Sequence, residues 1–236
     1  GSSSVEKLRE SFYKIDAGHV KTLGSTAVSQ TMASGISAYI SGILGLGNLV
    51  TTNSSACCTG TEAIITGFER IQSGKAKRML VGGCSDDGPY LWGGFDAMKV
   101  ITYKHNNTPE KASRPMSATA SGFVPGSGAG ALLLESLTSA TERGAKIYGE
   151  IVGGAMNAGG QRGTGSMTAP NNEAVQRCIK SAVENAGINA DEIDLINGHL
   201  TATIKDAAEI NNWSVALNRK GNDFPYIHSL KSMTGH

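Results

Sequence analysis

The sequence predicts an α/β protein, and two observations carry this prediction. Short apolar runs that end at glycine or polar turns alternate with segments of helical period over most of the 236 residues. The composition, with 39% hydrophobic and 17% charged residues, is typical of a chain that folds around an apolar core. A high glycine count, 31 against 6 prolines, adds many tight turns between the elements.

The first third of the chain is expected to contain three helices and one strand. A polar beginning predicts a short helix around residues 5–13, and a run rich in small residues predicts a buried helix over 28–43. An apolar stretch predicts a strand over 49–54. The helical period of residues 61–73 ends at Gly74, which predicts an amphipathic helix with a glycine stop.

The middle of the chain is expected to be rich in strands. Residues 78–84 predict a strand that runs into a glycine turn, and 86–98 predict irregular structure followed by a helix over 94–98. A polar loop is expected over 103–114. Residues 122–124 and 130–135 predict two adjacent strands, with a glycine-rich turn over 125–129 between them. Residues 126–130 have the spacing G-x-G-x-G and lead into a strand-like run and not a helix, so they do not indicate a dinucleotide loop.

The last third returns to strict alternation. Expected here are a helix over 139–144, a strand over 146–153, a mobile loop over 157–168, a helix over 171–186, a turn over 190–193, a strand over 194–197, a helix over 201–217 and a strand over 225–230. Gly187 is expected to close the helix before it as a C-cap.

Charge and cysteine content exclude several classes of function. A net charge of +1 gives no electrostatic case for binding nucleic acid or an anionic membrane. The apolar run over 32–50 is interrupted by serines and glycines and is not expected to span a membrane. The beginning of the chain lacks the pattern of a signal peptide. The four cysteines form no C-x-x-C pair, so reduced thiols in the cytoplasm are expected and no zinc site.

Cys57 is the candidate nucleophile. It lies in Ser-Ala-Cys-Cys-Thr-Gly, residues 55–60, between the expected strand and the expected helix that follows. A cysteine at such a turn projects from the backbone at the positive end of a helix, which favours the thiolate. The ordinary alternative is that Cys57 is a small buried core residue, and this motif alone does not decide between the two.

Two of the five histidines follow expected strands. His199 comes directly after the strand over 194–197, and His236 follows the strand over 225–230. Parallel α/β folds place their chemistry at the carboxyl ends of strands. A thiol and two histidines in such positions would suit acyl transfer from a thioester. The remaining histidines are interpreted as structural: His19, His105 and His228.

Three motifs in order resemble the β-ketoacyl-acyl-carrier-protein synthases of the thiolase-like superfamily, closest to the type I and II enzymes of fatty acid synthesis. Residues 55–60 are similar to the family's nucleophile motif, with Cys57 at its cysteine. Residues 199–203, His-Leu-Thr-Ala-Thr, resemble H-G-T-S-T. Residues 231–236, Lys-Ser-Met-Thr-Gly-His, match K-[SA]-M-T-G-H in full. Supporting similarities lie at residues 94–98, 108–114 and 122–124.

The resemblance implies a layered αβαβα fold of two similar halves, of which this chain would hold the second part of one and the first part of the other. The implied domains are 1–156 with the nucleophile and 157–236 with the histidines. Complete members are longer at both ends, and their C-terminal part carries a Gly-Phe-Gly-Gly loop with an oxyanion donor. Members of the family are homodimers.

The resemblance also implies the chemistry. Cys57 would take an acyl chain as a thioester, and His199 and His236 would stabilise the enolate left when malonyl-acyl-carrier protein loses carbon dioxide. Lys231 would hold the local charge network, with Glu209 as a structural carboxylate. Substrates would arrive on the phosphopantetheine of the acyl-carrier protein, in a tunnel lined by Thr201 and Thr203. No metal or redox cofactor is implied.

Departures from the family pattern keep alternatives open. Leu200 stands where the family motif has glycine, and residues 204–206 are one residue shorter than the corresponding stretch. Cys58 adds a second thiol beside the nucleophile. A coenzyme A-dependent thiolase would share the cysteine but not the intact 231–236 motif, and relatives that start chains from coenzyme A carry asparagine at the second histidine. A non-catalytic chain-length-factor-like subunit would lack the cysteine.

Overall fold

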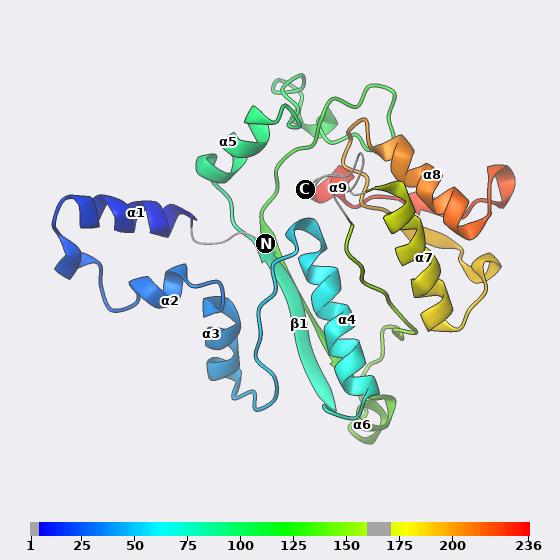
Figure 1. Ribbon diagram of the computed structural model, residues 1–236, viewed down its shortest axis with the longest axis horizontal. Coiled ribbons are helices and arrows are strands. Elements are labelled where there is room, and N and C mark those ends of the chain that lie inside the picture. Colours follow the sequence, from blue (N-terminus) through cyan, green and yellow to red (C-terminus); the bar gives the residue numbers. More distant parts are fainter. Residues whose placement is uncertain (1–4, 160–170) are drawn as a thin grey trace. The chain divides into compact units, whose positions relative to one another are not determined.

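The computed structural model describes residues 5–159 and 171–236, and these form two compact units (Figure 1). Of the described residues, one unit comprises 5–94 and 127–146, and the other comprises 95–126, 147–159 and 171–236. The expected domain division at 156/157 stays a prediction. Most of the loop expected over 157–168 lies outside the described residues.

The first unit is built on a two-stranded antiparallel ladder covered by one helix. Strand β1 (Arg78–Ser85) pairs with β2 (Gly128–Glu135), so that Met79 lies opposite Leu134 and Val81 opposite Leu132. Helix α4 (Thr59–Gln72) lies along this ladder (Figure 1). Ile65 of the helix and Met79 and Val81 of the ladder are buried.

Helix α4 approaches the ladder closely because Gly67 has no side chain. A Cβ atom at Gly67 would lie 2.5 Å from Val81 Cγ1 and 3.2 Å from Leu134 Cδ1. The remaining helices of this unit are α1 (Val5–Asp16), α2 (Ala27–Thr31), α3 (Gly35–Leu44) and α6 (Leu137–Glu142), with 3-10 turns at Val20–Thr22 and Ala56–Cys58.

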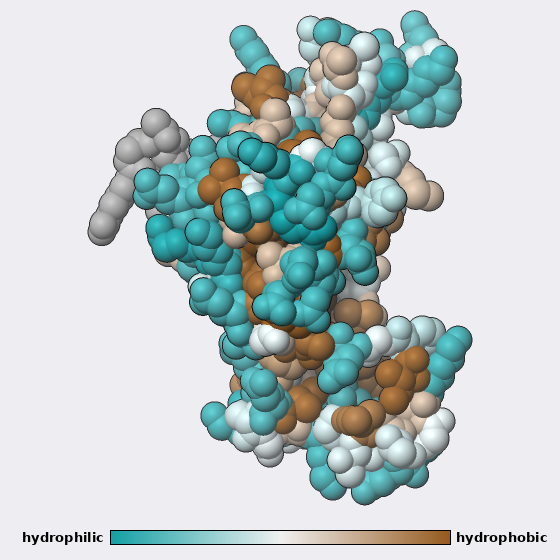
Figure 2. Space-filling view, turned by 90° about the vertical axis from the view of Figure 1, so that its right-hand side faces the viewer, coloured by the Kyte–Doolittle hydropathy of each residue, from teal (hydrophilic) through white to brown (hydrophobic). Residues whose placement is uncertain are grey.

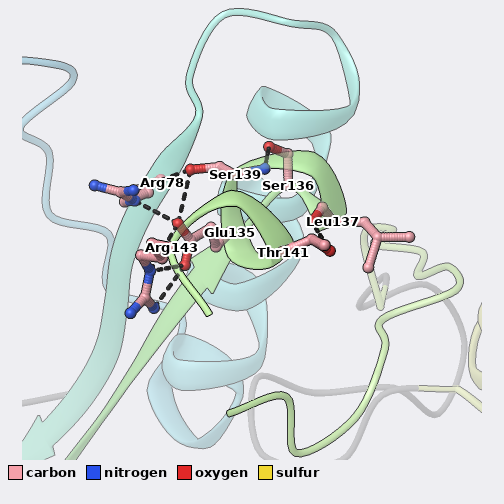
Figure 3. A network of polar contacts seen from close by, with 7 residues as sticks. All are labelled: Arg78, Glu135, Ser136, Leu137, Ser139, Thr141 and Arg143. Atoms are coloured by element: carbon pink, nitrogen blue, oxygen red, sulfur yellow. Dashed lines mark hydrogen bonds and ion pairs between the residues drawn. The ribbon is translucent and has the colours of Figure 1, made fainter. Parts of the chain in front are cut away.

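An ion-pair network fixes the end of the ladder to α6 (Figure 3). Glu135, whose side chain is only 5% exposed, accepts from Arg78 Nε at 2.5 Å and from Arg143 Nε at 2.8 Å. Ser139 Oγ donates to the same carboxylate at 2.7 Å. The hydrogen bond from Arg143 has the largest effect, and together these bonds lower the pKa of Glu135 to about 2.

The second unit contains a parallel pair of short strands and two packed helices. Strand β3 (Leu195–Asn197) pairs with β4 (Tyr226–His228), and α7 (Asn172–Ala186) lies against α8 (Asp206–Leu217). The core joins these elements through Ile179, Ile196 and Leu217, together with Val175, Val183, Ala190, Ile193, Trp213, Ala216, Phe224 and Ile227.

The other elements of the described residues are short. Helix α5 (Pro89–Ala97) spans the boundary between the units, and α9 (Lys231–Thr234) follows β4. The 3-10 turns are Pro109–Lys111, Ala190–Glu192 and Gly221–Asp223.

Most of the expected helices and strands are present. The expectations for 5–13, 61–73, 78–84, 130–135, 139–144, 171–186, 194–197 and 225–230 are confirmed as α1, α4, β1, β2, α6, α7, β3 and β4, with shifted ends. Gly187 closes α7 in the left-handed conformation, with φ +67°. The helix expected over 94–98 begins earlier, at Pro89, and the one expected over 201–217 begins at Asp206.

The buried helix expected over 28–43 is wrong. The segment forms the two helices α2 and α3, and Val28 is 68% and Ile43 79% exposed. The break falls at Met32, whose extended backbone ends α2. The apolar composition of this segment therefore misled the prediction, because it forms an exposed apolar surface.

Three of the expected strands do not form, and all three lie within the described residues. Residues 49–54 form no ladder, and their contacts run through side chains, such as Ser37 Oγ to Thr52 Oγ1 at 2.6 Å. Residues 146–153 form no strand, and Gly153 instead passes close to Ala186 at the end of α7. Residues 122–124 contribute only a single parallel bridge, Ile101 to Phe123, so the expected adjacent pair 122–124/130–135 is wrong. A strand requires a backbone partner, which local sequence does not reveal.

Large apolar side chains remain exposed on several elements. Figure 2 shows one face, on which hydrophobic patches lie among hydrophilic residues. Helices α2 and α3 contribute Val28, Ile36, Tyr39, Ile40 and Ile43 to the exposed apolar surface, and β2 contributes Leu132 and Leu133. Within the described residues, no helix combines the length and apolar character that crossing a bilayer requires.

Candidate active site

Cys57 lies at the amino-terminal end of α4, as expected. It is the middle residue of the 3-10 turn Ala56–Cys58, and α4 begins two residues later at Thr59. Both Cys57 and Cys58 are exposed. The residue before the nucleophile, Ala56, adopts the left-handed conformation with φ +49°. The helix is present, but the strand expected to lead into the turn is not.

The amino-terminal turn of α4 packs closely on β1. A Cβ atom at Gly83 would lie 3.2 Å from Gly60 Cα and 3.5 Å from Gly60 N. The absence of a side chain at Gly83 permits this approach of backbone to backbone, whereas a Cβ atom at Gly60 would lie 4.0 Å from Gly83 Cα, an ordinary contact. The position of the Cys57 turn is therefore set against the ladder of its own unit.

The second unit places His199 in a tight loop after β3. The backbone N–H of Gly198 donates to His228 O of the neighbouring strand at 2.8 Å, which continues the parallel pairing up to the histidine. Leu200 and Ala202 have positive φ angles, +22° and +61°, and both side chains are fully buried. Such backbone is unfavourable for residues with a Cβ and persists only where other contacts hold it.

Two carboxylates from the first turn of α8 supply these contacts. Glu209 accepts from the backbone N–H of His199 at 2.6 Å and of Leu200 at 2.8 Å. Asp206, which is buried, accepts from the N–H groups of Thr201 at 2.9 Å and Thr203 at 3.3 Å. Its second oxygen accepts from the N–H of Met116 at 2.9 Å.

His236 is held by backbone on both sides. Its N–H donates to Val124 O at 2.8 Å, and its carbonyl accepts from Gly126 N at 2.7 Å. The ring packs edge-to-face on Phe123, with ring centroids 4.9 Å apart. Residues 122–124 therefore serve the site as a support for His236, although they were expected to be a strand beside 130–135.

The two histidine rings lie together. The centroids of His199 and His236 are 4.9 Å apart and the rings are nearly perpendicular. Burial, with help from His199 and Lys231, lowers the pKa of His236 to about 4. Burial of its ring lowers the pKa of His199 as well, although the residue as a whole retains exposed surface. Lys231 adds to this effect, and Glu209 and Asp206 oppose it. Both imidazoles are therefore neutral near pH 7, so each can donate an N–H to a carbonyl oxygen.

The other predicted residues of the second unit lie around this pair. Lys231 is half-buried at the start of α9, where its carbonyl accepts from Ser113 Oγ. Thr201 and Thr203 are half-buried, with their Oγ1 atoms 3.1 Å apart. The structure thus brings together His199, His236, Lys231, Glu209, Thr201 and Thr203 within one unit, and it places Cys57 in the other.

Sequence reasoning missed two supporting residues. Asp206 was noted only for its position in a shortened stretch, yet it binds three backbone N–H groups. An aspartate at the start of a helical segment is a signal for such a role. Phe123 was assigned to a strand, and its contacts with Phe95 and His236 depend on long-range packing that local sequence does not show.

Comparison with known proteins places the chain in a family. A model of the β-ketoacyl synthase N-terminal domain matches residues 2–140, and a model of the C-terminal domain matches 148–236. The chain belongs to the β-ketoacyl synthase family. Its order of motifs and its thiolase-like α/β fold are those expected for a member of this family.

Individual relatives support the same family. The chain is 38% identical to 3-oxoacyl-[acyl-carrier-protein] synthase 1 of Haemophilus influenzae, over 92% of this chain and 51% of that protein. A solved β-ketoacyl synthase from Burkholderia phymatum has a TM-score of 0.90 and 32% identity, covering 100% of this chain and 56% of that one.

A third relative is a complex. It is a type II PKS acyl-carrier protein in complex with its ketosynthase bound to the hexaketide. It matches with a TM-score of 0.87 and 29% identity, over 98% of this chain and 57% of that one. The chain therefore spans about half the length of the relatives it matches.

Proposed function

We propose that this ketosynthase chain takes part in decarboxylative Claisen condensation, the elongation step of fatty acid synthesis. The observation that carries the proposal is the pair of neutral histidines, His199 and His236, whose rings lie 4.9 Å apart beside Lys231. Two N–H donors can share one oxygen on which negative charge develops, and such stabilisation is a large contribution to catalysis in chemistry of this kind.

The reaction begins with acyl transfer to Cys57. The Cys57 Sγ atom attacks the carbonyl carbon of an acyl thioester, and the phosphopantetheine thiol of the acyl-carrier protein leaves. The proposed role of Cys57 is supported by its exposed position two residues before the start of α4, because a helix amino terminus stabilises a thiolate.

The condensation then uses the malonyl group. Its terminal carbon–carbon bond breaks, carbon dioxide leaves, and the electron pair forms an enolate whose oxygen His199 and His236 stabilise. The enolate carbon attacks the carbonyl of acyl-Cys57, and the Cys57 thiolate leaves as the β-ketoacyl product forms. No metal or redox cofactor is needed in this sequence of steps, and this expectation remains a prediction.

The supporting residues have separate proposed roles. Burial contributes most to keeping the histidines neutral, and the proposed role of Lys231 is to add to this effect, since its positive charge disfavours imidazolium. Glu209 holds the backbone of the His199 loop, which supports the structural role proposed for it. Thr201 and Thr203 are proposed to contact the phosphopantetheine arm.

The deciding experiment measures intact mass after incubation with an acyl-carrier-protein thioester, followed by peptide mapping. We expect one acyl adduct on Cys57 that is lost in Cys57→Ser and kept in Cys58→Ser. His199→Ala and His236→Ala should still form the adduct but lose carbon dioxide release from malonyl-acyl-carrier protein by about 10²-fold or more. No adduct, on this chain or on a longer version, would favour a chain-length-factor-like subunit.

The partners and location belong to the proposal as well. A relative solved with its acyl-carrier protein supports an acyl-carrier protein as partner. The exposed apolar surface of α2 and α3 supports a homodimer, because monomers rarely expose large contiguous apolar patches. Light scattering tests the dimer, and cell fractionation tests the proposed cytoplasmic location, which rests on the expectation of reduced thiols.

A further inference from the structure

A carboxylate in the first turn of α4 lies beside the candidate nucleophile and belongs to none of the motifs above. Glu62 accepts through one oxygen, Oε2, from two side chains of the segment that precedes Cys57. Asn53 Nδ2 donates at 2.7 Å, and Ser55 Oγ donates over a short contact. Glu62 and Asn53 are half-buried, so these bonds are only partly open to water.

Further hydrogen bonds join the same two segments across the nucleophile. Asn53 Nδ2 also donates to Thr59 O at 3.2 Å, and Ser55 N donates to Thr59 Oγ1 at 2.9 Å. Thr59 Oγ1 in turn donates to Ala56 O at 2.7 Å. Residues 53–56 are therefore tied to the first turn of α4 on both sides of Cys57.

The backbone at this turn requires such support. Ala56 has φ +49°, a left-handed conformation that a residue with a Cβ adopts only under constraint. Residues 49–54 form no backbone ladder that could hold the segment. The side-chain bonds to Glu62 and Thr59 therefore help to fix the approach to Cys57, together with the backbone bond from Cys58 N to Ser55 O at 3.0 Å.

We propose that Glu62 is a positioning residue, which holds the strained turn at Ala56 through Ser55 and Asn53 and so fixes the direction of the Cys57 thiol. The inference deepens the proposed function and rests on it for the role of Cys57. Glu62 touches neither the substrate nor the reacting atoms in this role.

The charge of Glu62 fits this role. The hydrogen bond from Ser55, followed by that from Asn53, lowers its pKa, so the carboxylate stays ionised and accepts from both donors. An acidic residue in the first turn is also stabilised by the helix amino terminus.

The test compares three variants of this chain: Glu62→Ala, Glu62→Gln and, as the matched control, Glu69→Ala. Glu69 is an exposed glutamate farther along α4. The first readout is the rate of alkylation by iodoacetamide, mapped separately for Cys57 and Cys58. The second is acyl transfer from an acyl-carrier-protein thioester, resolved into kcat and KM. Circular dichroism confirms that each variant is folded.

We expect Glu62→Ala to change the ratio of Cys57 to Cys58 alkylation at least threefold. It should also lower kcat about tenfold and change KM less than twofold, because an altered direction of the thiol affects the chemical step more than substrate binding. Glu62→Gln keeps an oxygen acceptor for both donors and should recover most of the rate. Glu69→Ala should behave as the unaltered chain.

A double-mutant cycle assigns the effect to the contact. If Glu62 acts through Ser55, the double variant Ser55→Ala/Glu62→Ala should react no more slowly than Glu62→Ala alone. Additive effects, or wild-type alkylation and kcat in Glu62→Ala, would overturn the inference. Alkylation needs no acyl-carrier protein, so a chain that shows the alkylation effect but takes no acyl group would refute the proposed function and keep the positioning role.

Discussion

Lys231 is the residue through which the charge of the histidine pair can be changed. Its ammonium group lowers the pKa of both His199 and His236, in each case after the larger effect of burial. Removing that positive charge without removing the packing of the side chain would separate the two causes. Methionine has a similar length and no charge.

We therefore predict that Lys231→Met raises the pKa of both histidines, His236 from about 4 toward its ordinary value of 6.5. Titration of the imidazole C–H signals by NMR measures this directly. The control is Lys205→Met, an exposed lysine that does not contribute to either shift. Unchanged histidine titration in Lys231→Met would show that burial and, for His236, the neighbouring His199 set the pKa values without Lys231.

Leu200 shows how a departure from the family motif is accommodated. Its φ of +22° suits glycine, the residue of the family motif, yet its side chain is fully buried, at 0% exposure. Packing thus offsets backbone strain at this position. The leucine side chain also packs against Gly198, because a Cβ atom at Gly198 would lie only 2.8 Å from Leu200 Cδ1 and Cγ.

We predict that Leu200→Ala lowers the free energy of unfolding by about 2–5 kcal/mol, because it leaves a cavity and keeps the strained backbone. Leu200→Gly removes a larger volume but relieves that strain. Its loss of unfolding free energy should therefore be smaller than the removed volume alone predicts. Urea denaturation measures both, and the exposed Leu137→Ala serves as control. A smaller loss for Leu200→Ala than for Leu137→Ala would contradict this account.

The helices α4 and α3 each contain a glycine, but only the glycine in α4 is required by packing. Gly67 in α4 is buried against β1, and a Cβ there would lie 2.5 Å from Val81 Cγ1. Gly42 in α3 is exposed, and a Cβ there would meet nothing within 4 Å. The intrinsic helix propensity gained by alanine is the same at both positions, so only packing differs.

Gly42→Ala is expected to stabilise the chain by about 0.5–1 kcal/mol through helix propensity. Gly67→Ala is expected to destabilise it by about 1–2 kcal/mol, because overpacking against β1 outweighs the same gain. Thermal and urea unfolding of the two variants in parallel checks the difference in sign. Stabilisation by both substitutions would mean that α4 can move away from the ladder at no cost.

For the whole molecule, two kinds of group make stability depend on pH. His236 has a pKa of about 4 in the folded chain, below its ordinary 6.5, so the unfolded chain takes up the proton first as the pH falls. Glu135 has a pKa of about 2, below its ordinary 4.5, so its contribution is fully present only above pH 4.5.

The predicted result is a loss of stability in two successive ranges, from about pH 6.5 to 4 for His236 and from about pH 4.5 to 2 for Glu135. Urea midpoints measured at intervals of pH detect it. Glu135→Gln should lower the midpoint at neutral pH and reduce the loss in the lower range, to which Glu10 and Glu62 also contribute because their pKa values are lowered too, while the upper range stays. A lower range that persists unchanged in Glu135→Gln would assign it to other carboxylates.

Sequence patterns were enough to predict the fold class, the family and the candidate residues Cys57, His199 and His236, but not the residues that support them. Helices with strong period and clear ends, such as α4 and α7, follow from local sequence, because their caps and apolar positions are local. The motifs around Cys57, His199 and His236 were recognisable because each is a contiguous stretch that carries its chemistry within a few residues.

The tertiary structure alone decided which apolar segments pair and what holds the site. Residues 49–54 and 146–153 resemble strands in composition but form no ladder, because a strand depends on a partner that lies far away in the sequence. The support of His236 by Phe123 was not predicted for the same reason, because these residues are far apart in the sequence. The bonds of Glu62 to Asn53 and Ser55 join neighbouring segments, but they depend on the turn at Ala56, which the sequence pattern did not show.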